Sequence, residues 1–214
     1  MGLFITFEGT EGSGKSTQLT LLAERLRQAG KTVRTLREPG GTPIGEEIRH
    51  TLKHSEANRK MAPETELLLM NASRAQLVRE IIEPALDAGE IVLCDRFFDS
   101  TVAYQACGRG LNHEFVKQVI SFAVGSTIPD LTLLLMVPVA VSEARRAQRS
   151  DLAPAPARDR FEESGREFFE RVEQGYMRIA ASEPRRVRVI EATAGVEAVR
   201  EAVWGAVQPL LQGR

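Results

Sequence analysis

A glycine-rich stretch near the start of the chain has the residue types that bind phosphate. It reads Gly9-Thr10-Glu11-Gly12-Ser13-Gly14-Lys15-Ser16-Thr17 and matches the pattern G-x-x-x-x-G-K-[ST]. Glycines let the backbone curl so that successive N–H groups point at phosphate oxygens, and the helix that follows adds its positive end. In such a loop the lysine reaches the β- and γ-phosphates and the serine hydroxyl takes a Mg²⁺ position. A ligand-free glycine turn is disfavoured, because a strand pattern precedes the stretch and a helical pattern follows it.

A second candidate site follows a later apolar run. Residues 91–94 are all apolar or cysteine, and Asp95 and Arg96 come directly after them. An apolar strand that ends in an acid resembles a Walker-B strand, whose aspartate holds Mg²⁺ directly or through water. Arg96 is unlike a pure metal site, and a positive charge there can bind a second phosphate group. The two motifs together predict a triphosphate donor facing a phosphate-bearing acceptor.

The elements that must position these motifs alternate along the whole chain. Strands are expected at 3–8, 32–37, 90–95, 131–136 and 186–190, and helices at 15–29, 43–54, 64–88, 99–106, 112–124, 138–149, 160–181 and 195–211. This alternation predicts an α/β fold, a three-layer doubly wound five-stranded parallel sheet with helices on both faces. Ligands then collect at the carboxyl ends of the strands, where each motif falls. We expect a single domain over residues 1–214 with a lid segment at about 145–160.

Length, composition and charge restrict the class of protein. The chain has 214 residues, 43% of them hydrophobic and 27% charged, as expected for one soluble domain with a real core. A net charge of −1 gives no sign of general affinity for nucleic acid or an anionic membrane. Cys94 and Cys107 fit reduced cytosolic thiols, and no apolar run approaches the ~20 residues of a spanning helix. The first strand begins at once, which leaves no room for a signal peptide. We therefore expect a cytoplasmic protein without a nucleic-acid or membrane partner.

Two helices and a loop offer further candidates. The turn from Arg37 to Pro43 contains a proline and two glycines, and it is either a substrate loop or an ordinary strand-to-helix connection. Met70 and Arg74 are four residues apart and share one helix face. Arg49 and Arg74 could converge on an anion, although a lone helical arginine is usually a solvated charge.

The segment after Asp95 carries a hydroxyl, an aromatic ring and an amide, in Ser100, Tyr104 and Gln105. A pyrimidine needs such an amide for its edge. The plainer interpretation is a polar loop that closes in a Gly-Arg-Gly turn, but a polar loop beside a phosphate site favours ligand binding.

Five arginines bracket an Ala-Pro stretch between residues 145 and 160. A flexible linker would explain this composition. A lid that closes over ATP explains it better, because phosphoryl transfer needs positive charge at the migrating group and closure excludes water.

Taken together, several motifs resemble bacterial thymidylate kinase over nearly the whole chain. They are Phe7-Glu8-Gly9 with the phosphate loop, Arg37-Glu38-Pro39-Gly40-Gly41-Thr42, the helix from Leu67 to Gln76, Asp95-Arg96-Phe97, Ala103-Tyr104-Gln105 with Gly108-Arg109-Gly110, and Pro129-Asp130-Leu131-Thr132. The resemblance implies a P-loop kinase fold and transfer of the γ-phosphate of ATP to dTMP, with Mg²⁺, in a homodimer, for dTTP supply.

Residue roles follow from this resemblance position by position. For ATP it implies the phosphate loop, lid arginines and a threonine near the adenine, namely Gly9, Gly12, Ser13, Gly14, Lys15, Ser16, Thr17, Arg145, Arg149 and Thr193. For dTMP it implies Glu11, Glu38, Pro39, Arg49, Met70, Arg74, Arg96, Ser100, Thr101, Tyr104 and Gln105. The implied metal ligands are Ser16, Glu11 and Asp95, and the implied catalytic residues are Lys15, Arg96, Arg149 and Glu11.

The resemblance also assigns contacts within the acceptor site. Arg74 and Arg96 would hold the dTMP phosphate, while Gln105 with Ser100 or Thr101 would read the thymine edge. Tyr104 would crowd the 2′ position of the sugar, and Glu11 would lie near the 3′-hydroxyl and the metal.

Met70 and the lid depart from the pattern of this family, the lid because it is longer than the usual short Arg-Gly stretch, with Ala153 to Ala157 as an apparent insertion. Gly12 stands where some members have a phosphate-loop arginine, so the transition-state arginine would come from the lid: Arg149 first, with Arg146 or Arg158 as alternatives. Met70 stands where many relatives stack an aromatic ring on the thymine, and its thioether can still pack on a ring face.

Two other functions remain to be separated from a nucleotide kinase. A monophosphate acceptor is ionised near neutral pH, with a second pKa of about 6, and needs alignment and charge neutralisation rather than a general base. A nucleoside kinase would need a carboxylate base, for which Glu38 is conceivable. A nucleotide switch is disfavoured because the chain has no guanine-reading Asn-Lys-x-Asp run.

Overall fold

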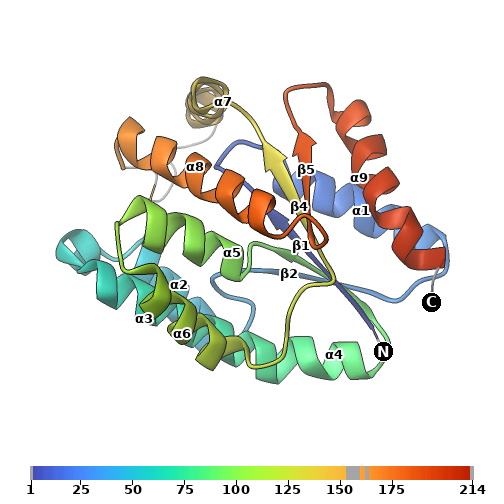
Figure 1. Ribbon diagram of the computed structural model, residues 1–214, viewed down its shortest axis with the longest axis horizontal. Coiled ribbons are helices and arrows are strands. Elements are labelled where there is room, and N and C mark those ends of the chain that lie inside the picture. The colour runs from blue at the N-terminus through green and yellow to red at the C-terminus, as the bar shows by residue number, and fades with distance from the viewer. Residues whose placement is uncertain (1, 153–159, 162–163, 213–214) are drawn as a thin grey trace.

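The computed structural model describes residues 2–152, 160–161 and 164–212 (Figure 1). Five parallel strands form the sheet: β1 Leu3–Glu8, β2 Val33–Arg37, β3 Ile91–Asp95, β4 Leu131–Met136 and β5 Val187–Glu191. Their order is β2-β3-β1-β4-β5. β1 is the central strand, with β2 and β3 on one side of it and β4 and β5 on the other. Phe7 of β1 is in register with Asp95 of β3, which itself pairs with Arg37 of β2, so the three strands end at one edge. This confirms the predicted α/β fold and brings the phosphate loop next to Asp95.

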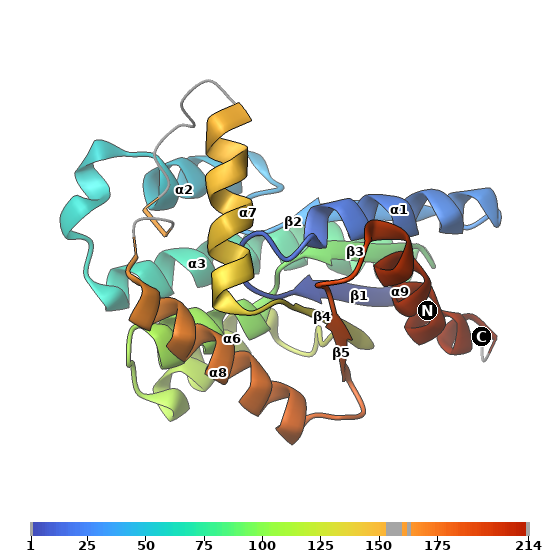
Figure 2. The same cartoon turned by 90° about the horizontal axis from the view of Figure 1, so that it is seen from above.

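The longer α-helices connect the strands and cover both faces of the sheet (Figures 1 and 2). They are α1 Lys15–Gln28, α2 Pro43–Lys53, α3 Pro63–Leu77, α6 His113–Val124, α7 Val139–Leu152, α8 Arg166–Ser182 and α9 Val196–Gln212. Shorter helical segments are η1 Glu56–Lys60, η2 Val78–Ile82, α4 Glu83–Asp87, α5 Phe98–Thr101 and η3 Val102–Gly108. Figure 2 shows α7 crossing the carboxyl ends of the strands, next to the loops that follow them.

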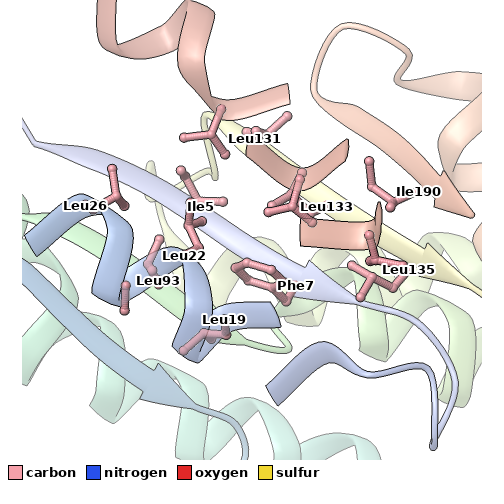
Figure 3. Close-up of a cluster of buried hydrophobic side chains, with 14 of the residues drawn as sticks. Ile5, Phe7, Leu19, Leu22, Leu26, Leu93, Leu131, Leu133, Leu135 and Ile190 are labelled. Atoms are coloured by element: carbon pink, nitrogen blue, oxygen red, sulfur yellow. The ribbon is translucent and has the colours of Figure 1, made fainter. Parts of the chain in front are cut away.

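Strand side chains alternate between two cores. On one face, Leu3, Ile5 and Phe7 of β1 pack with buried residues of α1 and α9 (Figure 3). On the other face, Phe4 of β1 joins the cluster formed with α3, η2, α4 and α6, while Leu134 of β4 packs with α8 and η3. This alternation fixes the register of β1, because a shift by one residue would exchange its two faces. A rigid β1 therefore presents the phosphate loop at its end.

Two predicted helices contain π-helical segments that the sequence did not predict, and a third begins later than expected. The single helix expected over 64–88 is α3, a π-helical turn η2 and α4, and Pro84 at the start of α4 cannot donate to the helical ladder. The helix expected over 99–106 is α5 followed by the π-helical segment η3. The helix expected from residue 160 begins only at Arg166, because Gly165 has extended backbone at its N-terminal boundary. The 3₁₀ turn η1 was not predicted.

Candidate active site

The phosphate loop joins β1 to α1 and has the conformation that its glycines allow. Gly9, Gly12 and Gly14 have φ angles of 136°, 75° and 91°. A Cβ at Gly9 would lie 2.2 Å from the carbonyl oxygen of Leu135, so only glycine fits there. Lys15 Nζ donates to the carbonyl oxygens of Thr10 at 2.8 Å and of Gly9 at 3.2 Å. Burial, together with the nearby charge of Arg96, lowers the pKa of Lys15 to about 8.

Ser16 and Asp95 form the oxygen-rich end of this loop. Ser16 Oγ donates to Asp95 Oδ2 at 2.5 Å, which joins the start of α1 to the end of β3. Hard oxygen donors suit Mg²⁺, which is usually held by one or two carboxylates together with phosphates and water. Among the described residues no group of three or more His, Cys, Asp or Glu side chains forms a closed metal cage. The donor set therefore fits a Mg²⁺ that is shared with nucleotide phosphates.

Glu11 lies on the acceptor side of the loop. Its Oε1 accepts from Arg96 Nη2 at 3.0 Å, and the charges of Arg96 and Lys15 hold the pKa of this carboxyl well below its usual range despite burial. In this position Glu11 is paired with a cation instead of with Ser16 or Asp95.

The adenine end predicted for ATP is a pocket between the phosphate loop and the end of β5. Arg145 of α7 bridges the two sides, with Nη1 donating to Gly12 O at 3.1 Å and Nη2 to Ala192 O at 3.0 Å. Ser142 Oγ donates to Glu11 O at 2.5 Å, so α7 is fastened directly to the loop. The pocket has a volume of about 770 Å³, and Thr193 lies in its lining with Arg145. The structure thus brings these two predicted ATP residues together.

The lid residues are only partly within the described structure. Arg146 and Arg149 belong to α7 by their backbone, but side chains are described only as far as Arg145. Arg158 lies outside the described residues, as does the stretch from Ala153 to Ala157. The choice among these arginines stays a prediction.

Next to the phosphate loop lies an acceptor cleft of about 480 Å³. Its lining includes every dTMP residue expected from the sequence except Arg49, and it adds Lys53 and Phe161. Arg49 lines the neighbouring donor cleft and its Nη1 donates to Pro39 O at 2.8 Å. Lys53 lines both clefts, as do Glu11, Glu38 and Arg96. These four residues mark the junction at which donor and acceptor would meet.

Arg96 is held in the acceptor cleft by four side-chain partners. Its φ is 71°, the one non-glycine residue among those described with a positive φ, and this turns its side chain away from the strand direction. Nη1 donates to Ser100 Oγ at 3.1 Å and Tyr176 Oη at 3.3 Å, and Nη2 to Tyr104 Oη at 3.2 Å as well as to Glu11. Its planar fork is therefore held in one orientation before any phosphate arrives.

Glu8, to which the sequence analysis gave no role, fixes two of the hydroxyl groups that contact Arg96. The buried carboxylate accepts from Ser100 Oγ at 2.6 Å and Tyr176 Oη at 2.7 Å, and from the backbone N–H of Phe97 at 2.8 Å. Burial raises the pKa of Glu8, and the charge of Asp99 adds to the shift. Glu8 ends an apolar strand, so its only sequence signal was an acid directly before the phosphate loop.

Arg74 and Glu38 form a buried ion pair, with Arg74 Nη2 2.7 Å from Glu38 Oε2. The remaining donors of Arg74 reach Asn71 Oδ1 and Thr101 Oγ1, both at 2.9 Å, and Phe97 O. Burial raises the pKa of Glu38 to about 7, outweighing the opposite effect of Arg74. Glu38 Oε1 is buried and makes no hydrogen bond to any described residue. Arg74 and Arg49 have these separate protein partners, and their convergence on an anion stays a prediction.

The far end of the acceptor cleft contains the amide of Gln105. Its Nε2 donates to Glu66 Oε1 at 2.6 Å, and Met70 lines the same cleft. Phe161 closes this end, with its ring edge-on to Tyr104 at 6.3 Å between centroids. Neither Glu66 nor Phe161 was singled out from the sequence, where Glu66 reads as a helix-start acid and Phe161 as core.

Fold and phosphate loop together define a P-loop kinase, with a triphosphate cleft and an adjoining cleft for a second phosphate compound. A family model described as thymidylate kinase matches residues 7–203. The chain therefore belongs to the thymidylate kinase family, whose members are enzymes that phosphorylate dTMP.

Individual relatives agree with this assignment. The chain is 49% identical to a thymidylate kinase of Geobacter sulfurreducens, with 95% of each chain covered, and 48% identical to one of Thermomicrobium roseum, covering 99% of this chain and 97% of the relative. A crystal structure of thymidylate kinase from Ehrlichia chaffeensis superposes with a TM-score of 0.77 at 33% identity, covering 97% of this chain and 98% of that one. In the part of the chain that the structure describes, no helix is long and apolar enough to span a membrane.

Proposed function

We propose how the two clefts divide the work of the thymidylate kinase reaction, in which the γ-phosphate of ATP is transferred to dTMP to give dTDP and ADP for dTTP biosynthesis. The observation that carries this proposal is the junction formed by Glu11, Glu38, Lys53 and Arg96, which line both clefts. A donor in one cleft and an acceptor in the other meet there. A phosphate oxygen of dTMP attacks the γ-phosphorus, the bond to the bridging β,γ-oxygen breaks, and ADP leaves with that electron pair.

On the donor side, the phosphate loop holds the β- and γ-phosphates through its backbone N–H groups and Lys15. Lys15 exchanges its contacts with Thr10 and Gly9 for phosphate oxygens. The negative charge of the phosphates then stabilises the buried ammonium group. Ser16 and Asp95, with Glu11 nearby, would hold Mg²⁺, and a bound Mg²⁺ would neutralise developing charge on the phosphates. Arg145 and Thr193 flank the adenine. Gly12 leaves the transition-state arginine to the lid at about 145–160, with Arg149 as the first candidate and Arg146 or Arg158 as alternatives.

On the acceptor side, Arg74 and Arg96 hold the dTMP phosphate, with Glu38, Pro39 and Arg49 nearby. Tyr104 lies against the sugar, Glu11 near its 3′-hydroxyl, and Met70 on the face of the thymine. Gln105 with Ser100 or Thr101 reads the base edge. The reaction needs no general base, because a phosphate acceptor is already ionised. The site fits this, because Glu38, the carboxylate that could serve as a base, is paired with Arg74.

Lys53 adds a cation to the set expected from the sequence. The charged residues lining the acceptor cleft are two acids, Glu11 and Glu38, and three bases, Lys53, Arg74 and Arg96. Glu38 is paired with Arg74 and Glu11 with Arg96, and the formal charges of the lining residues sum to a net positive value. The Lys53 ammonium is a compact charge on a flexible side chain, so it can stay close to the phosphoryl group during transfer. Its positive charge would reduce the repulsion between the donor and acceptor phosphates.

A side-by-side acceptor assay tests this proposal. ADP release from Mg-ATP is measured with dTMP, dUMP, dCMP, thymidine and no acceptor. ADP formation with dTMP far above the other tubes supports the assigned acceptor cleft, and its loss with EDTA supports a requirement for the divalent cation. Equal slow release in every tube contradicts the acceptor assignments and leaves only the phosphate loop.

We also propose a homodimer that uses α6 and α3, in a single-domain cytoplasmic enzyme. Phe115 and Phe122 are seven residues apart on α6 and both are exposed, Phe122 to 91%, and Leu68 of the adjacent α3 is exposed as well. An exposed apolar face of this kind is typical of a protein interface. Phe122→Glu should convert the dimer to a monomer in light scattering, whereas exposed Met177→Glu on α8 should not. A wild-type monomer at micromolar concentration would contradict the proposal.

A further inference from the structure

Gln105 is joined to a buried carboxylate whose other partners are both cations. Glu66 of α3 has no solvent-exposed surface. Its Oε1 accepts from Gln105 Nε2 at 2.6 Å, and its Oε2 accepts from Arg160 Nη1 at 2.5 Å and Arg109 Nε at 3.2 Å. A buried acid with two arginine partners is held in place on both oxygens.

This contact determines which way round the amide of Gln105 lies. A carboxylate is only an acceptor, so the amide atom facing Glu66 must be the nitrogen. One N–H of Gln105 is then used, and its carbonyl oxygen and second N–H remain for a ligand. A flipped amide would place two acceptors 2.6 Å apart, which no hydrogen bond could compensate.

The fixed amide presents one acceptor and one donor in a defined order to the acceptor cleft, which Gln105 lines. The edge of thymine offers the matching N3–H donor and C4 carbonyl acceptor. Cytosine offers the reverse, an N3 acceptor and a 4-amino donor, and it would need the flipped amide. Without Glu66, a glutamine could satisfy either base by rotating its amide by half a turn.

We propose that Glu66 is a positioning residue that sets base selectivity by locking the amide of Gln105 against reversal. This inference rests on the proposed role of Gln105 in reading the base. Glu66 itself contacts no substrate. Its effect is on the choice between two pyrimidines, while the alignment of the phosphates depends on Arg96 and Lys15.

Glu66→Gln tests this directly, because a neutral amide of the same shape can face either orientation of Gln105. We expect the ratio of kcat/KM for dTMP to that for dCMP to fall by roughly tenfold or more, mainly through a gain with dCMP and a higher KM for dTMP, since an unmatched buried hydrogen-bonding group is what rejects the wrong base. The kcat with dTMP should change little. Glu66→Asp keeps an acceptor-only partner and should retain the wild-type ratio even if both KM values rise.

Matched variants separate the inference from a structural effect and from the proposed function. Glu64→Gln makes the same change on the exposed surface of the same helix and should leave the ratio unchanged. An equal loss with both substrates in Glu66→Gln, together with a lower melting temperature, would overturn the inference. If Gln105→Leu leaves the ratio at its wild-type value, then the base-reading role of Gln105 fails; if Gln105→Leu lowers the ratio and Glu66→Gln does not, then only the role of Glu66 fails.

A measurement on the unchanged protein covers the case in which Glu66→Gln does not fold. In ¹⁵N-glutamine-labelled enzyme with dTMP, one side-chain amide proton of Gln105, assigned with Gln105→Leu, should be shifted downfield and protected from exchange. Two amide protons that exchange freely would contradict a locked amide.

Discussion

The donor and acceptor clefts share one edge of the sheet, yet they are built in different ways. Half of the residues that line the donor cleft come from one continuous stretch, residues 11–17, whose shape depends on glycine conformation and whose backbone N–H groups are suited to phosphate. The acceptor cleft is formed by side chains from separate parts of the chain, including the loop after β2, α3, the segment after β3 and η3. Backbone recognition is therefore local in sequence, and side-chain recognition is not.

The acceptor cleft depends on buried acids that hold its other polar side chains in place. Glu8 holds the hydroxyls that contact Arg96, Glu38 pairs with Arg74, and Glu66 holds Gln105. Each fixes the orientation of a residue predicted to contact the substrate, and a buried charge with its partners in place restricts movement strongly. Changing such an acid should alter affinity for dTMP, selectivity or pH dependence, whereas changing a residue of the donor cleft should lower kcat.

Lys15→Met should have the largest effect and should be confined to the donor side. Loss of a cation that contacts the migrating phosphate should lower kcat by about 10²–10³-fold. Affinity for dTMP alone, measured by calorimetry, should stay unchanged, because Lys15 does not line the acceptor cleft. Lys31→Met, in the exposed loop between α1 and β2, is the matched control. An equal loss of dTMP affinity in Lys15→Met would show that the two clefts are not independent.

The same contrast explains how much could be predicted from the sequence. The strands were predicted to within one residue, because continuous or alternating apolar runs bounded by glycine and charge are local signals. The phosphate loop was recognisable for the same reason. The helix expected over 64–88 was right in its extent, because the chain is helical without a break from Pro63 to Asp87. The π-helical turn η2 within it was not predicted; it lies directly before Pro84, which has no N–H to donate.

The acids beneath the acceptor cleft could not be found in this way. Glu8 and Ser100 are 92 residues apart, and Glu66 and Gln105 are 39 apart, so neither pairing leaves a trace in local spacing. Glu66 also lies in the first turn of α3, where an acid is expected from the helix dipole alone. Only the folded arrangement distinguishes it from its neighbour Glu64.

Glu38→Gln should change the pH dependence of stability by an intermediate amount. Burial raises the pKa of Glu38 from 4.5 to about 7, so the folded protein binds this proton more tightly than the unfolded chain. The resulting stabilisation is complete below about pH 4.5 and is lost as the pH rises through 7, and a shift of this size corresponds to about 3 kcal/mol. In Glu38→Gln, the free energy of unfolding in urea should therefore fall less steeply between these pH values.

The control for this pH profile is Glu47→Gln, on the exposed side of α2, which should keep the wild-type slope. An unchanged slope in Glu38→Gln would mean that Glu38 is ionised throughout this range. Its pair with Arg74 would then outweigh its burial, and the acceptor cleft would be more accessible to water than its geometry implies.

Lys53→Met should give the smallest of these effects and should sharpen the comparison most, because Lys53 lines both clefts. A charge that acts where the two phosphates meet should contribute to kcat, by about tenfold, and much less to the KM of either substrate alone. Lys53→Arg should restore most of the rate, and Lys60→Met, an exposed lysine in η1, should have no effect. Lys53 also ends α2, where a cation favours the helix terminus, so melting temperatures must be measured in parallel. A variant that is less stable but has the wild-type kcat would assign Lys53 to the helix end, and the junction would then depend on Arg96 and the lid alone.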